Sequence, residues 1–160
     1  MKISLPFIAL MFAGATSAAE LSPFGVLGDW EIKVDPSNGN GCLMERKLSS
    51  GTRVQIGVVP DKEGAFFAAY NPSWTSIEEG QTGQLLFDFG DSRFQGEVVG
   101  VKKDDIPGGY AFFNNPNFVS EFGLRFDVTL KGENGTTETI DLTGSKVALD
   151  AVKACQDSQN

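Results

Sequence analysis

Histidine is absent from the 160 residues of this chain, and cysteine occurs only twice. Hydrolytic sites of the Ser-His-Asp and Cys-His types need an imidazole base, so the sequence excludes them in their usual forms. Metal centres built on imidazole are excluded for the same reason. An Asp-x-Asp-x-Asp-Gly loop is also missing, which leaves Asp104-Asp105 and residues 88–91 as weak calcium candidates. Their ordinary role is to form turns.

Positive charge is scarce as well. The chain has 13 Lys and Arg against 21 Asp and Glu, a formal net charge of −8, which becomes −9 without Lys2. Such a surface repels phosphate backbones and anionic lipids, so neither nucleic acid nor a membrane surface is expected as a partner. We expect no cofactor and no metal, and a partner that is a protein, a glycan or a small molecule.

The beginning of the chain has the features of a cleavable export signal. Lys2 precedes an apolar run over residues 3–13, and small residues follow up to Ala19. The apolar run is shorter than the roughly 20 residues that cross a bilayer. We therefore predict cleavage after Ala19, one domain over residues 20–160, and a periplasmic or secreted location.

The two cysteines, Cys42 and Cys155, are more than 100 residues apart. In an oxidising compartment such a pair usually forms a disulfide, which is the prediction here. Two reduced thiols are the alternative, and a nucleophilic or metal-binding role would then lack a histidine partner.

Alternating apolar and polar residues indicate β-strands between Gly-rich and Asn-rich turns. The clearest strand is predicted over residues 123–131, with Leu124, Phe126, Val128 and Leu130 facing inward. The fold is predicted to be mainly β, an antiparallel meander that forms a small sandwich or barrel of about eight strands. Only residues 145–156 have a helical pattern, and the disulfide would tether this C-terminal α-helix to the second strand.

Two groups of side chains are candidates for a site. Residues 71–83 form a predicted loop with Trp74, Glu78 and Glu79, and Phe112, Phe113 and Phe118 lie beside other predicted turns. If exposed, these six residues would form a partner-binding surface; the alternative is that the rings fill the core. The carboxylates of Glu78 and Glu79, with those of Asp88 and Asp91, could also supply the acid/base pair of a hydrolase without histidine. The alternative is that they are ordinary solvated side chains.

The segment from Gly28-Asp29-Trp30 through Cys42 to Cys155 resembles small exported bacterial proteins of the invasion-associated locus B group. The most specific part is Gly144-Ser145-x-x-Ala148-Leu149, a helix that ends at a cysteine. The resemblance implies a role in contact with host cells or in the envelope, and it carries over no catalytic residue.

The same Gly-Asp-Trp start, with the cysteine that follows it, is also similar to small periplasmic inhibitors of secreted metalloproteases, which are β-barrels with one disulfide. Their N-terminal segment reaches into the protease, and residues 20–25 would be its counterpart here. A non-enzymatic binding or interaction protein is therefore the primary hypothesis. A protease inhibitor and a carboxylate-only hydrolase are the alternatives.

Overall fold

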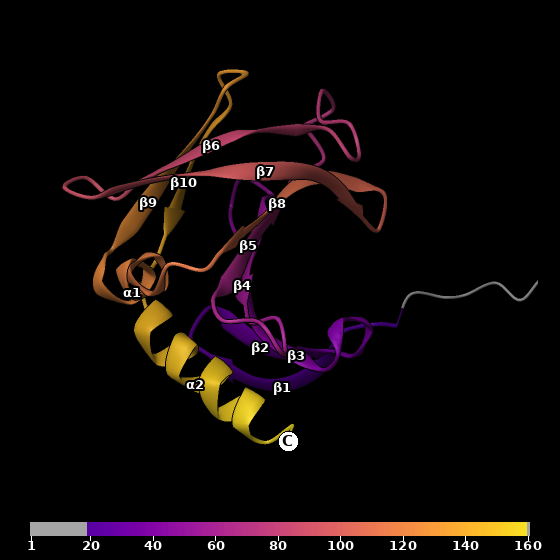
Figure 1. The fold of residues 1–160 in the computed structure, drawn as a ribbon, viewed down its shortest axis with the longest axis vertical. Helices are drawn as coiled ribbons and strands as arrows, with labels where there is room; N and C mark the ends of the chain where they lie inside the picture. The colour runs from indigo at the N-terminus through magenta and orange to yellow at the C-terminus, as the bar shows by residue number, and fades with distance from the viewer. Residues whose placement is uncertain (1–18, 160) are drawn as a thin grey trace, which may run out of the picture.

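Ten antiparallel strands form one curved sheet in the computed structural model, which describes residues 19–159 (Figure 1). In chain order they are β1 (Ser22–Leu27), β2 (Trp30–Asp35), β3 (Gly41–Lys47), β4 (Arg53–Gly57), β5 (Ala65–Tyr70), β6 (Thr82–Asp88), β7 (Arg93–Lys103), β8 (Ile106–Phe113), β9 (Asp127–Gly132) and β10 (Thr137–Asp141). The other described elements are a 3-10 helix (Pro36–Asn38) and two α-helices, α1 (Pro116–Leu124) and α2 (Ser145–Asp157). The mainly β, antiparallel fold is confirmed, with ten strands in place of about eight. The predicted leader lies outside the described residues except for Ala19.

The order of the strands in the sheet is β1-β2-β3-β4-β5-β8-β7-β6-β9-β10. The first five strands are a meander, but the chain then passes over β8 and β7 before it begins β6. Strands β1 and β10 are the two edges and do not pair with each other. The structure therefore has a single sheet that curls towards a barrel and stays open (Figure 1).

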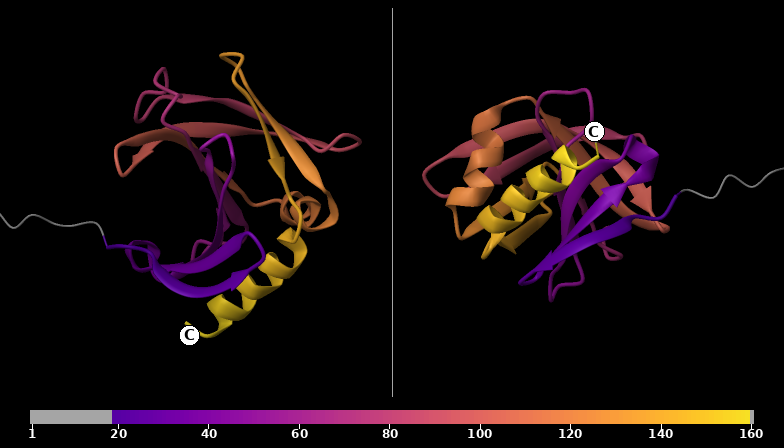
Figure 2. Two further views of the ribbon diagram at one scale, coloured as in Figure 1. Left: turned by 180° about the vertical axis from the view of Figure 1, so that it is seen from behind. Right: turned by 90° about the horizontal axis from the view of Figure 1, so that it is seen from below.

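Helix α2 lies across β2 and β3 (Figure 2). The disulfide between Cys42 and Cys155 joins the helix to the sheet. Both half-cystines are fully buried. The side chain of Gln156 adds a hydrogen bond, because its Oε1 accepts from the Cys42 backbone N at 2.9 Å. The predicted helix, the pairing of the cysteines and the tether to the strand after β2 are all confirmed.

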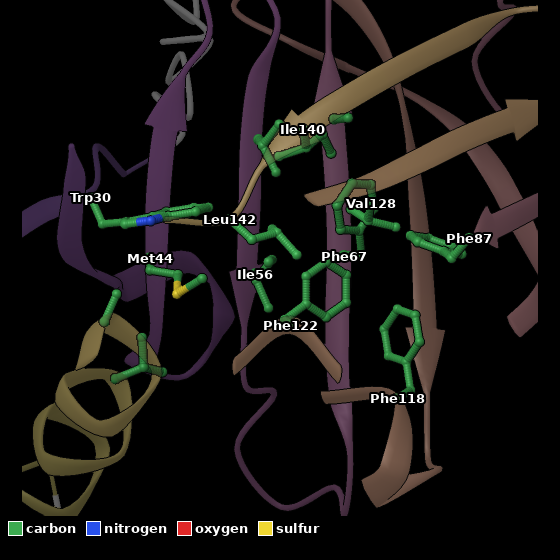
Figure 3. Packing of buried hydrophobic residues seen from close by; sticks show 14 of the residues in the cluster. Trp30, Met44, Ile56, Phe67, Phe87, Phe118, Phe122, Val128, Ile140 and Leu142 are labelled. Carbon is green, nitrogen blue, oxygen red and sulfur yellow. The ribbon is translucent and has the colours of Figure 1, made fainter. Parts of the chain in front are cut away.

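The inner face of the curled sheet encloses an aromatic core (Figure 3). Phe87 lies at its centre, with ring centroids 4.9 Å from both Phe67 and Phe118 in edge-to-face arrangements. Phe113 and Phe122 surround the same ring. Edge-to-face pairs contribute about 0.5 to 1.5 kcal/mol each beyond the area that they bury. The contacts among these five phenylalanines thus join β5, β6, β8 and α1 in one core.

Strand β5 is buried on both faces, as its continuous apolar run predicts. Phe67 and Ala69 face the aromatic core, whereas Phe66 and Tyr70 belong to a second cluster on the outer face with Leu43. Burial there raises the pKa of the Tyr70 hydroxyl to about 12. The outer face of the central strands is therefore a second, smaller core.

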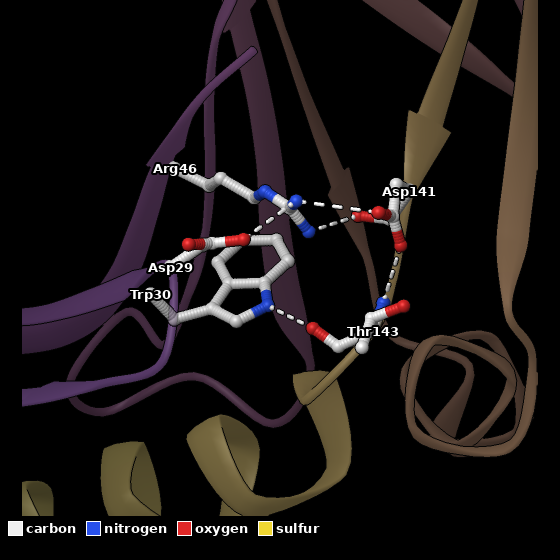
Figure 4. Close-up of polar contacts among 5 residues, drawn as sticks. All are labelled: Asp29, Trp30, Arg46, Asp141 and Thr143. Atoms are coloured by element: carbon white, nitrogen blue, oxygen red, sulfur yellow. Dashed lines mark hydrogen bonds and ion pairs between the residues drawn. The ribbon is translucent and has the colours of Figure 1, made fainter.

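Side chains bridge the gap between β3 and β10 (Figure 4). Arg46 Nη1 donates to the carbonyl oxygen of Asp141 at 2.8 Å, and Nη2 pairs with the carboxylates of Asp29 and Asp141. Trp30 lies under the guanidinium, and its Nε1 donates to the Thr143 carbonyl at 3.0 Å. Hydrogen bonds from Thr143, and then the charge of Arg46, lower the pKa of the Asp141 carboxyl. We call these contacts the β3–β10 seam.

Helix α1 corrects the prediction that only the C-terminal segment is helical. Asn115 caps it by accepting from the backbone N of Asn117 at 3.0 Å, and Pro116 occupies the first turn. Both residues are standard helix starts, although they also suit the turn that the sequence analysis expected. The strand begins only at Asp127, so Leu124 and Phe126 are 69% and 83% exposed and do not face inward.

Strand β1 was not predicted, because five of its six residues are exposed and the strand shows no alternation of apolar and polar residues. It pairs with β2 from Ser22 to Leu27, with a register shift between Pro23 and Gly25. This pairing fixes most of residues 20–25 in the sheet. In the described part of the chain, only Ala19, Glu20 and Leu21 precede the strand, which weakens the comparison with a protease-inhibiting arm.

Candidate functional site

The loop between β5 and β6 covers one end of the curled sheet. Because β5 and β6 are separated in the sheet by β8 and β7, the connecting residues 71–81 must pass across both strands. The loop makes backbone hydrogen bonds to each of them on the way, from Asn71 N to Pro107 O and from Gly80 N to Gly100 O. The topology thus places Trp74 over the interior of the sheet.

Asn71 fixes the first half of this loop. Its buried side-chain amide donates to Thr52 Oγ1 at 2.8 Å, and its Oδ1 accepts from the backbone N and the hydroxyl of Ser73. Its carbonyl accepts from Trp74 N at 3.0 Å. A buried amide with all these partners holds one backbone conformation. Trp74 is therefore presented from a rigid support.

Strand β7 fixes the second half of the loop. Gly100 exchanges backbone hydrogen bonds with Gly80 and Gln81 at 2.8 and 2.7 Å. A Cβ at position 100 would collide with the Glu78 carbonyl oxygen, so only glycine allows the loop to pack this closely. The ladders of β7 show no register shift at Gly96 or Gly100. Gly96 instead makes room for the ring of Phe113.

A cavity of about 300 Å³ lies beneath the loop, against the inner face of the sheet. Its volume is at the lower end of the roughly 300 to 1,000 Å³ that ligand pockets have. The apolar part of the wall comes from the loop and from strands β5, β6, β7 and β9: Phe67, Trp74, Ile77, Leu85, Val98 and Leu130. The combination of a deep apolar wall and an opening edged by polar groups is typical of a small-molecule site. We call it the Trp74 cavity.

The polar edge of the Trp74 cavity is acidic. Glu133, in the β9–β10 turn, and Glu138, on β10, both line it. Glu133 Oε2 accepts from Gln84 N at 3.1 Å, and Glu138 Oε1 accepts from Ser50 Oγ at 2.8 Å. Within residues 19–159, no lysine or arginine lines the cavity. Any ligand therefore meets apolar walls and negative charge.

Of the predicted site residues, only Trp74 lines the cavity. Glu78 and Glu79 lie on the same loop with exposed side chains that are not part of the wall. Phe112 is 37% exposed on β8 and lies 5.6 Å from Lys62 Nζ in a cation–π contact. The structure thus does not bring these predicted residues together into one site.

Phe113 and Phe118 are core residues. Their rings stack with centroids 3.7 Å apart, and neither side chain is available to a partner. The alternative that placed them on an exposed binding surface is therefore wrong, and the interpretation that they fill the core is confirmed. Their position beside predicted turns was misleading, because Phe118 belongs to helix α1, which packs its apolar side under the sheet.

The proposed pair of catalytic carboxylates finds no support in the geometry. Asp88 forms ion pairs with Lys131 at 2.8 Å and with Arg93 at 3.4 Å. Asp91 pairs with Arg125, whose guanidinium also binds Glu121. None of Glu78, Glu79, Asp88 and Asp91 lines the Trp74 cavity. Both aspartates therefore have structural partners that join β6, β7, β9 and α1.

The ion pairs of Asp88 predict how the fold responds to acid. The hydrogen bond from Lys131, then that from Gly90 N and the contact with Arg93, lower the pKa of this carboxyl to about 2. A lowered folded-state pKa adds stability above the unfolded-state pKa of about 3.9, and this stability disappears as the pH falls to about 2. We expect Asp88→Asn to unfold more readily than the wild type at pH 7 and equally readily near pH 2, as measured by urea unfolding. A constant difference at every pH would contradict this prediction.

The weak calcium candidates are explained by a turn. Asp104 and Asp105 join β7 to β8 as a two-residue hairpin, and both have positive φ angles, 53° and 63°. Asp and Asn tolerate this left-handed conformation better than most residues. Among residues 19–159, no group of three or more acidic or cysteine side chains is placed to hold a metal ion. The interpretation of these aspartates as turn residues is confirmed.

Sequence reasoning missed most of the cavity wall. Alternation indicates that Leu85 and Leu130 face inward, but it does not show that their strands are neighbours or that space remains between them. The only usable signal was the loop that carries Trp74. A better one would have been Gly83 on β6, which lines the cavity and leaves room beside the side chains of Val98 and Glu133.

Among residues 19–159, no helix is long and apolar enough to cross a membrane. The chain matches no protein-family model, no curated protein and no solved structure in the comparisons made with them.

Proposed function

We propose that this chain is an exported binding protein that holds a small, largely apolar ligand in the Trp74 cavity. The observation that carries the proposal is a cavity of about 300 Å³ that opens to solvent and has apolar walls on the inner face of the sheet. A concave, mostly apolar space with a few polar groups at its opening is the usual form of a small-molecule site. The loop that covers the cavity is held by buried hydrogen bonds, which suits a preformed site.

Export is part of the same proposal. The predicted leader points to an oxidising compartment, and the buried disulfide between Cys42 and Cys155 is compatible with one. A periplasmic or secreted location would place the protein among envelope components or at contacts with a host, as the resemblance to the invasion-associated locus B group implies. An inhibitor that inserts its N-terminus into a protease is the second candidate, and the pairing of β1 with β2 speaks against it.

A cavity-filling substitution tests the proposal. Gly83 lies on β6, and a Cβ added there would be 4.0 Å from Val98 Cγ1 and 3.6 Å from Glu133 Oε2, an ordinary contact distance. Gly83→Val should therefore fold normally while its side chain occupies the cavity. We expect the neutral fluorescent probe N-phenylnaphthylamine to bind the wild type and to bind Gly83→Val about tenfold more weakly or worse, a loss of about 1.4 kcal/mol.

Gly25→Val is the matched control. Gly25 also lies in a strand, and a Cβ there would meet nothing within 4 Å, but the residue is on β1, away from the cavity. This variant should bind the probe like the wild type. If the wild type does not bind the probe, or if Gly83→Val and Gly25→Val bind it equally well, the Trp74 cavity is not the site.

A further inference from the structure

We infer that the Trp74 cavity selects amphiphiles with a positively charged head group, such as alkylammonium compounds, and rejects those with an anionic head. This inference rests on the proposed function and names the class of ligand. The apolar body of the ligand would lie against the inner wall, and its cationic group would lie at the opening near Glu133 and Glu138. Three features of the cavity support the assignment.

The first feature is that both carboxylates lack a cationic partner. Among residues 19–159, neither Glu133 nor Glu138 forms a salt bridge, although eleven such contacts occur elsewhere in this part of the chain. Each accepts one hydrogen bond from a neutral donor through a single oxygen. A carboxylate has about four acceptor positions, so each retains capacity for a charged donor. Their charge is thus available to a ligand.

The second feature is that none of the described residues that line the wall carries a positive charge. Lys131 is the closest basic residue along the chain to Glu133, and its Nζ pairs with Asp88 at 2.8 Å. An anionic head group would therefore find no counter-charge in the wall and would be repelled by the two carboxylates at the opening. Repulsion of this kind is an efficient source of specificity, because it penalises the wrong ligand directly.

The third feature is the aromatic and aliphatic character of the wall. The face of a tryptophan attracts ammonium groups, and Trp74 borders the same space as the two carboxylates. Leu85, Val98 and Leu130 offer no hydrogen bonds, so a polyamine with charges along its whole length would leave them unmatched. An apolar body with a single cationic end fits both parts of the cavity.

Competition with N-phenylnaphthylamine tests the inference. Decyltrimethylammonium, decanol and decanoate have the same alkyl chain and a positive, neutral or negative head at neutral pH. We expect decyltrimethylammonium to displace the probe from the wild type at a concentration about tenfold lower than decanoate, with decanol between them. Added salt should weaken the binding of decyltrimethylammonium and leave that of decanol unchanged.

Two pairs of substitutions locate the charge effect. In Glu133→Gln/Glu138→Gln the preference for the cation should disappear while the probe still binds, because glutamine keeps the size and the acceptor oxygen. Glu78→Gln/Glu79→Gln is the control, since it removes two charges from the same end of the molecule but outside the wall, and it should keep the preference. The salt titration of the wild type needs no variant, so it decides the question even if the double variant folds poorly.

The outcomes distinguish a failure of the charge preference from a failure of the proposed binding function. If decanoate displaces the probe as well as decyltrimethylammonium does, or if the preference survives in Glu133→Gln/Glu138→Gln, the inference about charge is wrong and the apolar binding site stands. If neither the probe nor any of the three decyl compounds binds the wild type, the proposed function fails, and the inference fails with it.

Discussion

Replacing Cys42 and Cys155 together by alanine is expected to lower the free energy of unfolding by about 4 to 5 kcal/mol. The bridge joins residues 113 positions apart, and the loss of such a long cross-link restores much chain entropy to the unfolded state. It also releases α2 from β3. The hydrogen bond from the Cys42 backbone N to the side chain of Gln156 remains between the two elements. Urea unfolding of the variant against the oxidised wild type measures the difference.

The reduced wild type is the control for this variant. It keeps both sulfur atoms in the core, so it separates the loss of the cross-link from the loss of side-chain volume. We expect reduction alone to account for most of the destabilisation. A decrease of less than about 1 kcal/mol in both cases would show that packing of α2 on β2 and β3 holds the helix without the bridge.

Trp30→Ala is expected to cost about 3 to 5 kcal/mol of stability. The indole is completely buried, its Nε1 donates to the Thr143 carbonyl, and its ring supports Arg46 in the β3–β10 seam. Truncation therefore leaves a cavity and breaks the contact between the two ends of the sheet. Trp30→Phe isolates the contribution of the hydrogen bond, since it keeps an aromatic ring but removes the donor to the Thr143 carbonyl. We expect this variant to lose about 1 kcal/mol of stability.

Trp74→Ala gives the opposite pattern if the proposed function is correct. Trp74 is half-buried, and although its ring also packs against the edge of the core, it lines a space that is already open, so truncation should cost only about 1 kcal/mol of stability. It should weaken the binding of N-phenylnaphthylamine strongly, whereas Trp30→Phe should not affect it. If Trp74→Ala destabilises the fold as much as Trp30→Ala does, Trp74 is a core residue and the loop is not a binding element.

Local patterns in the sequence predicted what depends on local chemistry. The alternation of apolar and polar residues indicated a mainly β fold, the helical pattern of residues 145–156 identified α2, and two cysteines allow only one intramolecular pair. Helix α1 was missed because Asn115 and Pro116 begin helices and turns equally well. Strand β1 was missed because an edge strand that is exposed on both faces has no reason to alternate.

The candidate site could not be predicted in the same way, because it depends on which strands are neighbours. The chain gives no sign that β5 pairs with β8 or that β6 lies beside β9. Without that order, Trp74 is an aromatic residue in a loop, and Glu133 and Glu138 are ordinary members of a hairpin. Strand order brings them to one cavity, and the absence of a side chain at Gly83 leaves room in its wall.

The long separation between β3 and α2 also sets the order in which the molecule can be completed during its synthesis. At roughly 5 to 20 residues per second, Cys155 emerges on the order of ten seconds after Cys42. Throughout that interval β2 and β3 have neither their covering helix nor their side-chain partners on β10. The first strands therefore spend this time with their apolar face uncovered, exposed to other chains and to chaperones until α2 arrives.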